Sequence, residues 1–169
     1  MRFITLALLA AGIASAQTQN PIVNSSKASF AEVKDYVLRS AEKVPENLWS
    51  FQPTPDVRTF GQLVAHIGDG QYEICGAVGT PTNKNIEKTA KGKAATIAAV
   101  KEAFGYCDAI YAKMTDATAG QVVTMFGQKS SRIGVMETNT AHTNLHYGNM
   151  ITYMRIKGIV PASSEPRKP

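Results

Sequence analysis

The sequence predicts an all-α protein, a four-helix bundle with a long connection between its second and third helices. Four segments repeat apolar residues at helical spacing, and strand signals are few. With 169 residues and 44% hydrophobic content, the chain suits a single domain with a sizeable core. Charged residues make up only 18% of the chain, which excludes global disorder.

A first helix is predicted from about Ser26 to Val44, because apolar residues recur there every three or four positions. Ser25 or Ser26 is expected to be its N-cap, and Pro45 is expected to stop it. The proline-rich segment that follows is predicted to be a connector, with room for one helical turn. Trp49, the only tryptophan, is expected to fill the end of the core.

A capping box predicts the start of the second helix, with Thr59 as the N-cap and Gln62 three residues later. Apolar residues at helical spacing continue this helix to about Val78. The polar stretch 79–92 ends at a glycine and is predicted to be a loop. This stretch is the long connection of the predicted bundle.

A third helix is predicted over residues 93–114, where apolar residues alternate spacings of three and four. These residues are Ile97, Val100, Phe104, Cys107, Tyr111 and Met114. The short apolar run 122–126 that follows fits either a brief extended piece or a bulky loop plug. The last helix is predicted over 131–157, with Gly158 in the C′ position.

The first 16 residues are predicted to be a signal peptide, because a basic residue precedes a short apolar stretch and the small-x-small site Ala14-Ser15-Ala16. Cleavage there leaves residues 17–160 as the bundle and 161–169 as a flexible tail. The apolar stretch is too short for a stable membrane span, and no cysteine follows the cut to carry a lipid. We therefore expect export to the periplasm or the medium without a stable membrane anchor.

The charge of the chain is only mildly positive. Eighteen basic and 13 acidic residues give +5, and removal of one arginine with the signal peptide leaves 17 against 13, or +4. No basic cluster interleaved with aromatic residues accompanies this excess, so nucleic-acid binding is not expected.

All three histidines of the chain fall on predicted helices: His66 on the second, His142 and His146 on the last. Residues four apart on a helix project from one face about one turn apart. The imidazoles of His142 and His146 can therefore share one metal ion. Taken alone, such a pair is more often exposed or satisfied within a core.

Polar residues form two strips beside the apolar faces of these helices. The strip on the last helix is made of Asn139, His142, His146 and Asn149. The strip on the second helix is made of Gln62, His66, Asp69 and Glu73. Buried polar groups need partners, so one hypothesis is a metal ion shared between the strips. The alternative is that both strips face solvent.

These residues resemble the DinB-like (DinB/YfiT-type) superfamily of four-helix metalloproteins over nearly the whole mature chain. The resemblance rests on Leu63-Val64-Ala65-His66-Ile67, on the segment 141–148 (AHTNLHYG) and on the segment 153–161 (YMRIKGIVP). Members bind a divalent metal, commonly nickel or zinc, through one histidine of the second helix and a H-x-x-x-H pair of the fourth. The resemblance implies that His66, His142 and His146 are the metal ligands here.

Three neutral imidazoles suit zinc or nickel and leave positions open for water or a small substrate of unknown identity. Asp69 and Glu73 are candidates for a fourth ligand or an outer carboxylate. Asn139 and Asn149 are candidates for orienting a bound group.

Characterised members of the family include transferases that use low-molecular-weight thiols and a maleylpyruvate isomerase. Export removes the chain from the compartment where such thiols are kept, whereas metal-dependent hydrolysis needs only water. The expected function is therefore an exported metal-dependent hydrolase or transferase. The alternative is a non-catalytic metal- or ligand-binding bundle, and a homodimer is a further expectation.

The two cysteines, Cys75 and Cys107, lie on the second and third predicted helices. In an oxidising compartment they can form one disulfide. The alternative is two unpaired cysteines in the core, where a free cysteine packs as a small hydrophobic residue.

Overall fold

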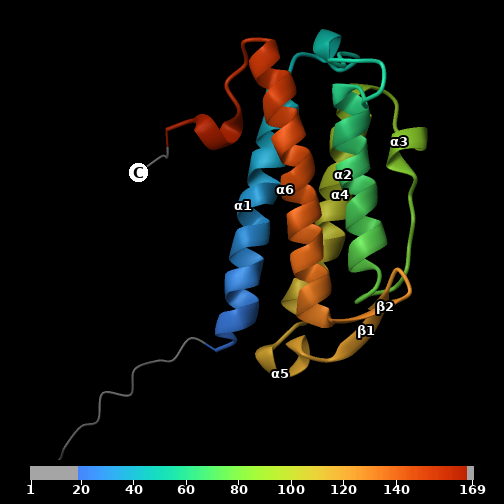
Figure 1. Ribbon diagram of the computed structural model, residues 1–169, viewed down its shortest axis with the longest axis vertical. Helices are drawn as coiled ribbons and strands as arrows, with labels where there is room; N and C mark the ends of the chain where they lie inside the picture. The colour runs from blue at the N-terminus through green and yellow to red at the C-terminus, as the bar shows by residue number, and fades with distance from the viewer. Residues whose placement is uncertain (1–18, 167–169) are drawn as a thin grey trace, which may run out of the picture.

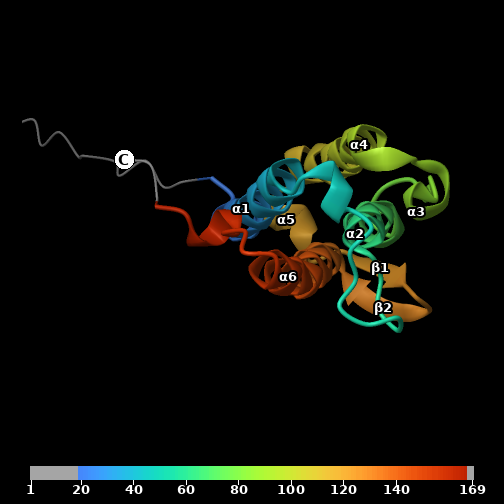
Figure 2. The ribbon, with the colours of Figure 1, turned by 90° about the horizontal axis from the view of Figure 1, so that it is seen from above.

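The computed structural model describes residues 19–166, and its four long helices pack side by side as a bundle (Figures 1 and 2). They are α1 (Pro21–Lys43), α2 (Phe60–Cys75), α4 (Gly92–Ala112) and α6 (Arg132–Ile156). The predicted all-α bundle is confirmed. Within the described range, no helix is both long and apolar enough to cross a membrane. The predicted signal peptide lies outside the described residues.

A long connection sets the direction of the third bundle helix. After α2 the chain returns through the one-turn helix α3 (Ile86–Thr89) to the end of the bundle where α2 begins. Helix α4 therefore runs in the same direction as α2 (Figure 1). Helices α1 and α6 run the opposite way, and α2 packs against both α4 and α6. This arrangement places the second and last helices of the sequence next to each other.

Helix α1 begins five residues before the predicted start, because its N-terminus is capped from a distant part of the chain. The carboxylate of Asp116, the first residue of α5 (Asp116–Ala119), accepts hydrogen bonds from the backbone N–H groups of Ile22 and Val23 at 3.1 and 2.9 Å. Asn20 in turn accepts a bond from the backbone of Asp116 at 2.9 Å. The predicted caps Ser25 and Ser26 instead lie within the helix.

Helix α2 starts at the predicted capping box, in which Thr59 and Gln62 exchange side-chain and backbone hydrogen bonds. It ends at Cys75 rather than near Val78. The chain turns at Gly76, where an added Cβ would lie 2.6 Å from the carbonyl oxygen of Tyr72.

The apolar run after α4 is an extended piece and not a loop plug. Strands β1 (Val122–Met125) and β2 (Gln128–Ser131) form an antiparallel hairpin in which Val122 pairs with Ser131. Phe126 and Gly127 form its two-residue turn with positive φ values of 49° and 76°, and the Phe126 side chain is exposed. Ser131 then caps α6 by accepting a bond from the N–H of Gly134.

The core lies between the four helices, and the apolar positions predicted for each helix are largely buried in it. The connector between α1 and α2 contains the 3-10 turn η1 (Glu46–Leu48), and it delivers Trp49 into one end of the core. The Trp49 indole donates to the carbonyl of Val44 at 3.1 Å and packs edge-on against Phe60.

A disulfide joins Cys75 at the end of α2 to Cys107 in α4. Both cysteines are fully buried, and 32 positions separate them in the sequence. The structure thus decides between the two interpretations of these residues that the sequence left open.

The segment 161–165 is not the frayed tail that its composition predicts. It contains the 3-10 turn η2 (Ala162–Ser164), and the side chain of Ala162 is buried. Glu165 forms ion pairs with Arg39 and Lys43 of α1, and the Ser40 hydroxyl accepts a bond from the N–H of Ala162. These partners lie more than 100 residues away in the sequence, so local periodicity carries no sign of them.

Candidate metal centre

The structure brings all three histidines together between α2 and α6. His66 comes from α2, and His142 and His146 come from successive turns of α6. One ring nitrogen of each histidine lies within 4.8 Å of one from each of the others. The centroids of the His66 and His146 rings are 4.6 Å apart, and those of His142 and His146 are 4.5 Å apart. Three histidines in this arrangement could hold a metal ion.

The spacing of the nitrogens fits a single ion. The Nε2 atoms of His66 and His146 are 3.2 Å apart. Two imidazole nitrogens bound to one zinc ion at the usual distances and a tetrahedral angle are separated by about 3.3 Å. The donor set also fits, since three imidazoles suit zinc, nickel and other borderline divalent metals.

Burial favours the neutral, ligating form of the rings. All three histidines are half-buried, and loss of solvent is the main cause that lowers the pKa of each from the usual 6.5. The pKa of His146 falls to about 4, with His142, His66 and Arg58 as further causes. The positive charge of Arg58 also lowers the pKa of His66 and of His142. At neutral pH each ring therefore keeps a lone pair available.

The Nδ1 atoms of His142 and His146 are buried and have no hydrogen-bond partner among the described residues. Buried polar atoms are usually satisfied, so these two nitrogens are exceptions within the cluster.

A glycine on α2 makes room for one of the rings. A Cβ added at Gly70 would lie 2.5 Å from Cε1 of His142 and 2.8 Å from its Nδ1. Real Cβ atoms essentially never approach other atoms so closely. The His142 ring therefore lies directly against the backbone of α2, and only glycine at position 70 leaves that space.

The other members of the two polar strips differ in their burial and in their partners. The Asp69 carboxylate accepts the backbone N–H groups of Ile86 and Glu87 at 2.6 and 3.0 Å, so it caps α3. Glu73 is exposed on α2. Asn139 is fully buried on α6, whereas Asn149 is exposed there and faces a cleft.

Beside the histidines lies a buried polar network that the sequence interpretation missed. The side chain of Gln71 accepts a bond from Asn139 at 2.7 Å and donates one to Thr143 at 3.0 Å. All three side chains are fully buried, and the sulfur of Cys107 lies 3.4 Å from the Gln71 side-chain oxygen. Gln71 lies four residues after Ile67 on the apolar face of α2, and a polar residue in that position was the available signal.

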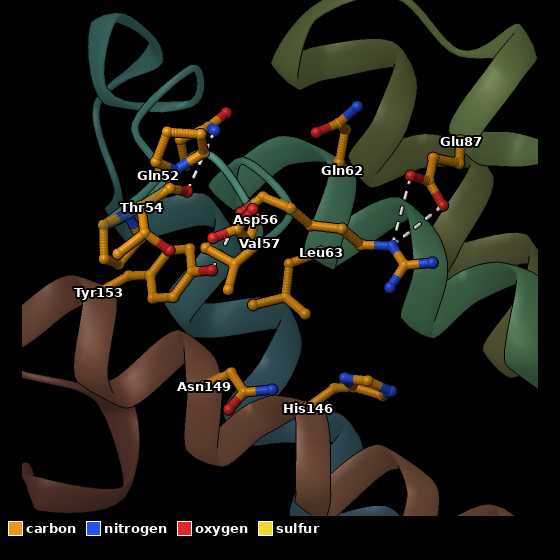
Figure 3. Close-up of a pocket in the computed structure, with 13 residues that line it drawn as sticks. Gln52, Thr54, Asp56, Val57, Gln62, Leu63, Glu87, His146, Asn149 and Tyr153 are labelled. Atoms are coloured by element: carbon orange, nitrogen blue, oxygen red, sulfur yellow. Dashed lines mark hydrogen bonds and ion pairs between the residues drawn. The ribbon is translucent and has the colours of Figure 1, made fainter.

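A cleft of about 870 Å³ opens on one side of the histidine cluster (Figure 3). His146 and Asn149 project into it from α6, opposite the loop that precedes α2 (Figure 3). Its lining consists of the loop residues 52–58 together with Gln62, Leu63, Glu87, His146, Asn149 and Tyr153. One histidine of the cluster thus borders a space large enough for a small molecule.

Comparison of the sequence with models of known protein families identifies the family of this chain. Residues 29–150, well over half of the chain, match the family model described as the DinB superfamily. The chain belongs to the DinB superfamily. No curated protein matches this member of the superfamily.

Solved structures share its fold. A DinB-like protein from Bacillus cereus ATCC 10987 superposes with a TM-score of 0.73 at 16% identity, over 86% of this chain and 97% of that one. The DinB-like protein YjoA from Bacillus subtilis gives a TM-score of 0.68 at 18% identity, over 85% and 100% of the two chains. A mycothiol-dependent maleylpyruvate isomerase gives a TM-score of 0.64 at 10% identity, over 76% of this chain and 60% of that one.

Proposed function

We propose that this DinB-superfamily protein is an exported hydrolase that uses one divalent metal ion, zinc or nickel, bound by His66, His142 and His146. The observation that carries the proposal is the convergence of three neutral imidazoles at the side of a cleft. A metal held by three histidines has open positions, at which it acidifies bound water and polarises a carbonyl oxygen.

The residues around the triad supply position and environment. Gly70 lets His142 approach α2, and burial keeps the imidazoles unprotonated at neutral pH. On the cleft side, Asn149 lies three residues after His146 and presents an amide that can hydrogen-bond a bound molecule.

The disulfide supports export. Structural disulfides form and persist in oxidising compartments and are rare in the cytosol. The buried bond between Cys75 and Cys107 therefore agrees with the N-terminal sequence pattern of a signal peptide. An oxidising compartment also favours hydrolysis over transfer of a low-molecular-weight thiol, although one structural neighbour is mycothiol-dependent.

Metal analysis of tag-free protein tests the metal site. We expect one zinc or nickel ion per chain, loss of that ion in His142→Ala, and its retention in Asn144→Ala. Asn144 is the matched control because it lies between the two histidines in sequence but is exposed on α6. Protein without a stoichiometric ion, or His142→Ala with unchanged metal content, would refute the metal site.

Ester and amide hydrolysis assays then test the catalytic part. Activity on p-nitrophenyl acetate should disappear after chelation and return on addition of zinc or nickel. If the ion is instead structural, chelation should unfold the protein, because the binding free energy of a structural metal is part of the folding free energy. Unfolding on chelation, without any hydrolysis beforehand, would support the non-catalytic bundle.

A further inference from the structure

Among residues 19–166, Arg58 is the one arginine or lysine in the lining of the cleft that His146 borders. Its Nε donates to both carboxylate oxygens of Glu87 in α3, at 3.3 and 3.2 Å. Within the part of the chain that the structure describes, neither Nη atom of Arg58 has a hydrogen-bond partner. The outer edge of the guanidinium therefore keeps its N–H donors, and 42% of the side chain is exposed.

One contact restrains the guanidinium of Arg58, and a second restrains its backbone. Besides the pairing with Glu87, the Tyr153 hydroxyl donates to the backbone carbonyl of Arg58 at 2.9 Å. Tyr153 belongs to α6, two turns after His146, so the base of the loop is tied to the helix that carries two of the histidines. An arginine restrained in this way loses less conformational entropy when it binds a ligand.

Arg58 and His146 line the same cleft. A molecule that binds beside His146 therefore lies within the field of Arg58. The acidic side chains of the lining are Asp56 and Glu87. These two carboxylates oppose a doubly charged anion more than a singly charged one.

We propose that the cleft selects small substrates that carry a carboxylate, which the Nη edge of Arg58 binds while the group to be cleaved lies beside His146. Planar carboxylates match the paired N–H donors of a guanidinium, and such charge-assisted bonds are strong. The inference rests on the proposed function for the reaction, but binding of the carboxylate by Arg58 is a separate property of the cleft.

Binding of benzoate and of its neutral isostere benzamide tests the inference, measured by NMR titration of the protein as purified and again after chelation. Metal content is determined on the same samples. We expect Arg58→Gln to weaken benzoate binding about tenfold or more and to leave benzamide binding unchanged. The matched control is Arg155→Gln, because Arg155 is an exposed arginine of α6 that does not line the cleft.

A change at Glu87 gives a result of opposite sign. Glu87→Gln removes the opposing negative charge, while the amide oxygen of the new side chain can still accept a hydrogen bond from Nε of Arg58. Benzoate binding should therefore strengthen, whereas the double variant with Arg58→Gln should bind benzoate weakly. Equal benzoate binding by wild type and Arg58→Gln would overturn the inference. It would also be overturned if Arg58→Gln weakened benzamide binding as much as benzoate binding. Tighter binding of inorganic phosphate than of benzoate would overturn the preference for a carboxylate.

Metal content and benzoate binding distinguish failure of the proposed function from failure of the inference about Arg58. Arg58-dependent benzoate binding in protein that takes up no metal would support the inference and refute the proposed function. A stoichiometric metal with benzoate binding independent of Arg58 would do the reverse.

Discussion

Replacement of Gly70 by alanine tests the packing of the candidate metal centre. The new Cβ would overlap the His142 ring, at 2.5 Å from Cε1, while ordinary van der Waals contact begins near 3.4 Å. The ring must therefore retreat by about 1 Å, whereas a metal ligand tolerates a displacement of only about 0.2 Å. We expect zinc or nickel affinity to fall at least tenfold to a hundredfold, as it does when the support of a ligand is disturbed.

Stability should change less than affinity. Alanine in a helix interior is favoured over glycine by about 1 kcal/mol, and overpacking of a buried site costs about 1 to 3 kcal/mol. Gly70→Ala should therefore lower the free energy of unfolding of the metal-free protein by about 0 to 2 kcal/mol. Gly148→Ala is the matched control on α6, because no other atom of the described residues is recorded within 4 Å of its added Cβ. The free energy of unfolding of this control should rise by about 0.5 to 1 kcal/mol, and its metal affinity should not change.

Competition with a chromophoric chelator measures the affinity, and urea unfolding monitored by circular dichroism measures the stability. In a His142→Ala background the ring is gone, so Gly70→Ala should no longer lower the free energy of unfolding through overpacking. The reasoning is refuted if Gly70→Ala behaves like Gly148→Ala in both measurements.

Three further predictions concern the rest of the molecule. Reduction of the Cys75–Cys107 disulfide should lower the free energy of unfolding by about 3 to 4 kcal/mol in the chain-entropy model, measured by urea unfolding with and without reductant, and an unchanged midpoint would contradict it. Asp116→Ala removes two bonds to the N-terminus of α1 and should cost about 1 to 2 kcal/mol, so a variant as stable as wild type would argue against this cap. In the metal-free protein, the folded-state pKa of His146 is about 4 against 6.5 in the unfolded chain, so the unfolded state takes up the proton first as the pH falls. The contribution of His146 to stability should therefore be complete above about pH 6.5 and decline toward pH 4, and thermal unfolding of His146→Gln should show a flatter pH dependence across this window.

Helix-forming patterns in the sequence predicted most of the fold. Apolar residues at a period near 3.6 identified the four bundle helices, and the capping box at Thr59 identified the start of α2. The start of α1 was predicted five residues late because its cap, Asp116, is supplied from a segment more than 90 residues away. The segment 161–165 was misjudged for the same reason, since Glu165 depends on the charges of α1.

For the candidate site, the sequence alone determined which residues are available. The chain contains three histidines, and the i, i+4 spacing of His142 and His146 places two of them on one helical face whatever the surroundings are. The family resemblance connected them with His66. Tertiary structure alone decided that His66 meets this pair, because the packing of α2 against α6 is a property of the whole bundle.

Tertiary structure also decided the separate roles of residues that look equivalent in the sequence. Asp69 lies on the same polar strip as His66, yet it caps α3, while the more strongly buried Gln71 organises the layer beside the histidines. Arg58 and Gly70 carry no local pattern that marks them, because their roles depend on distances to other helices. Spacing along one helix is fixed by backbone geometry, but proximity between helices arises only when their apolar faces pack together.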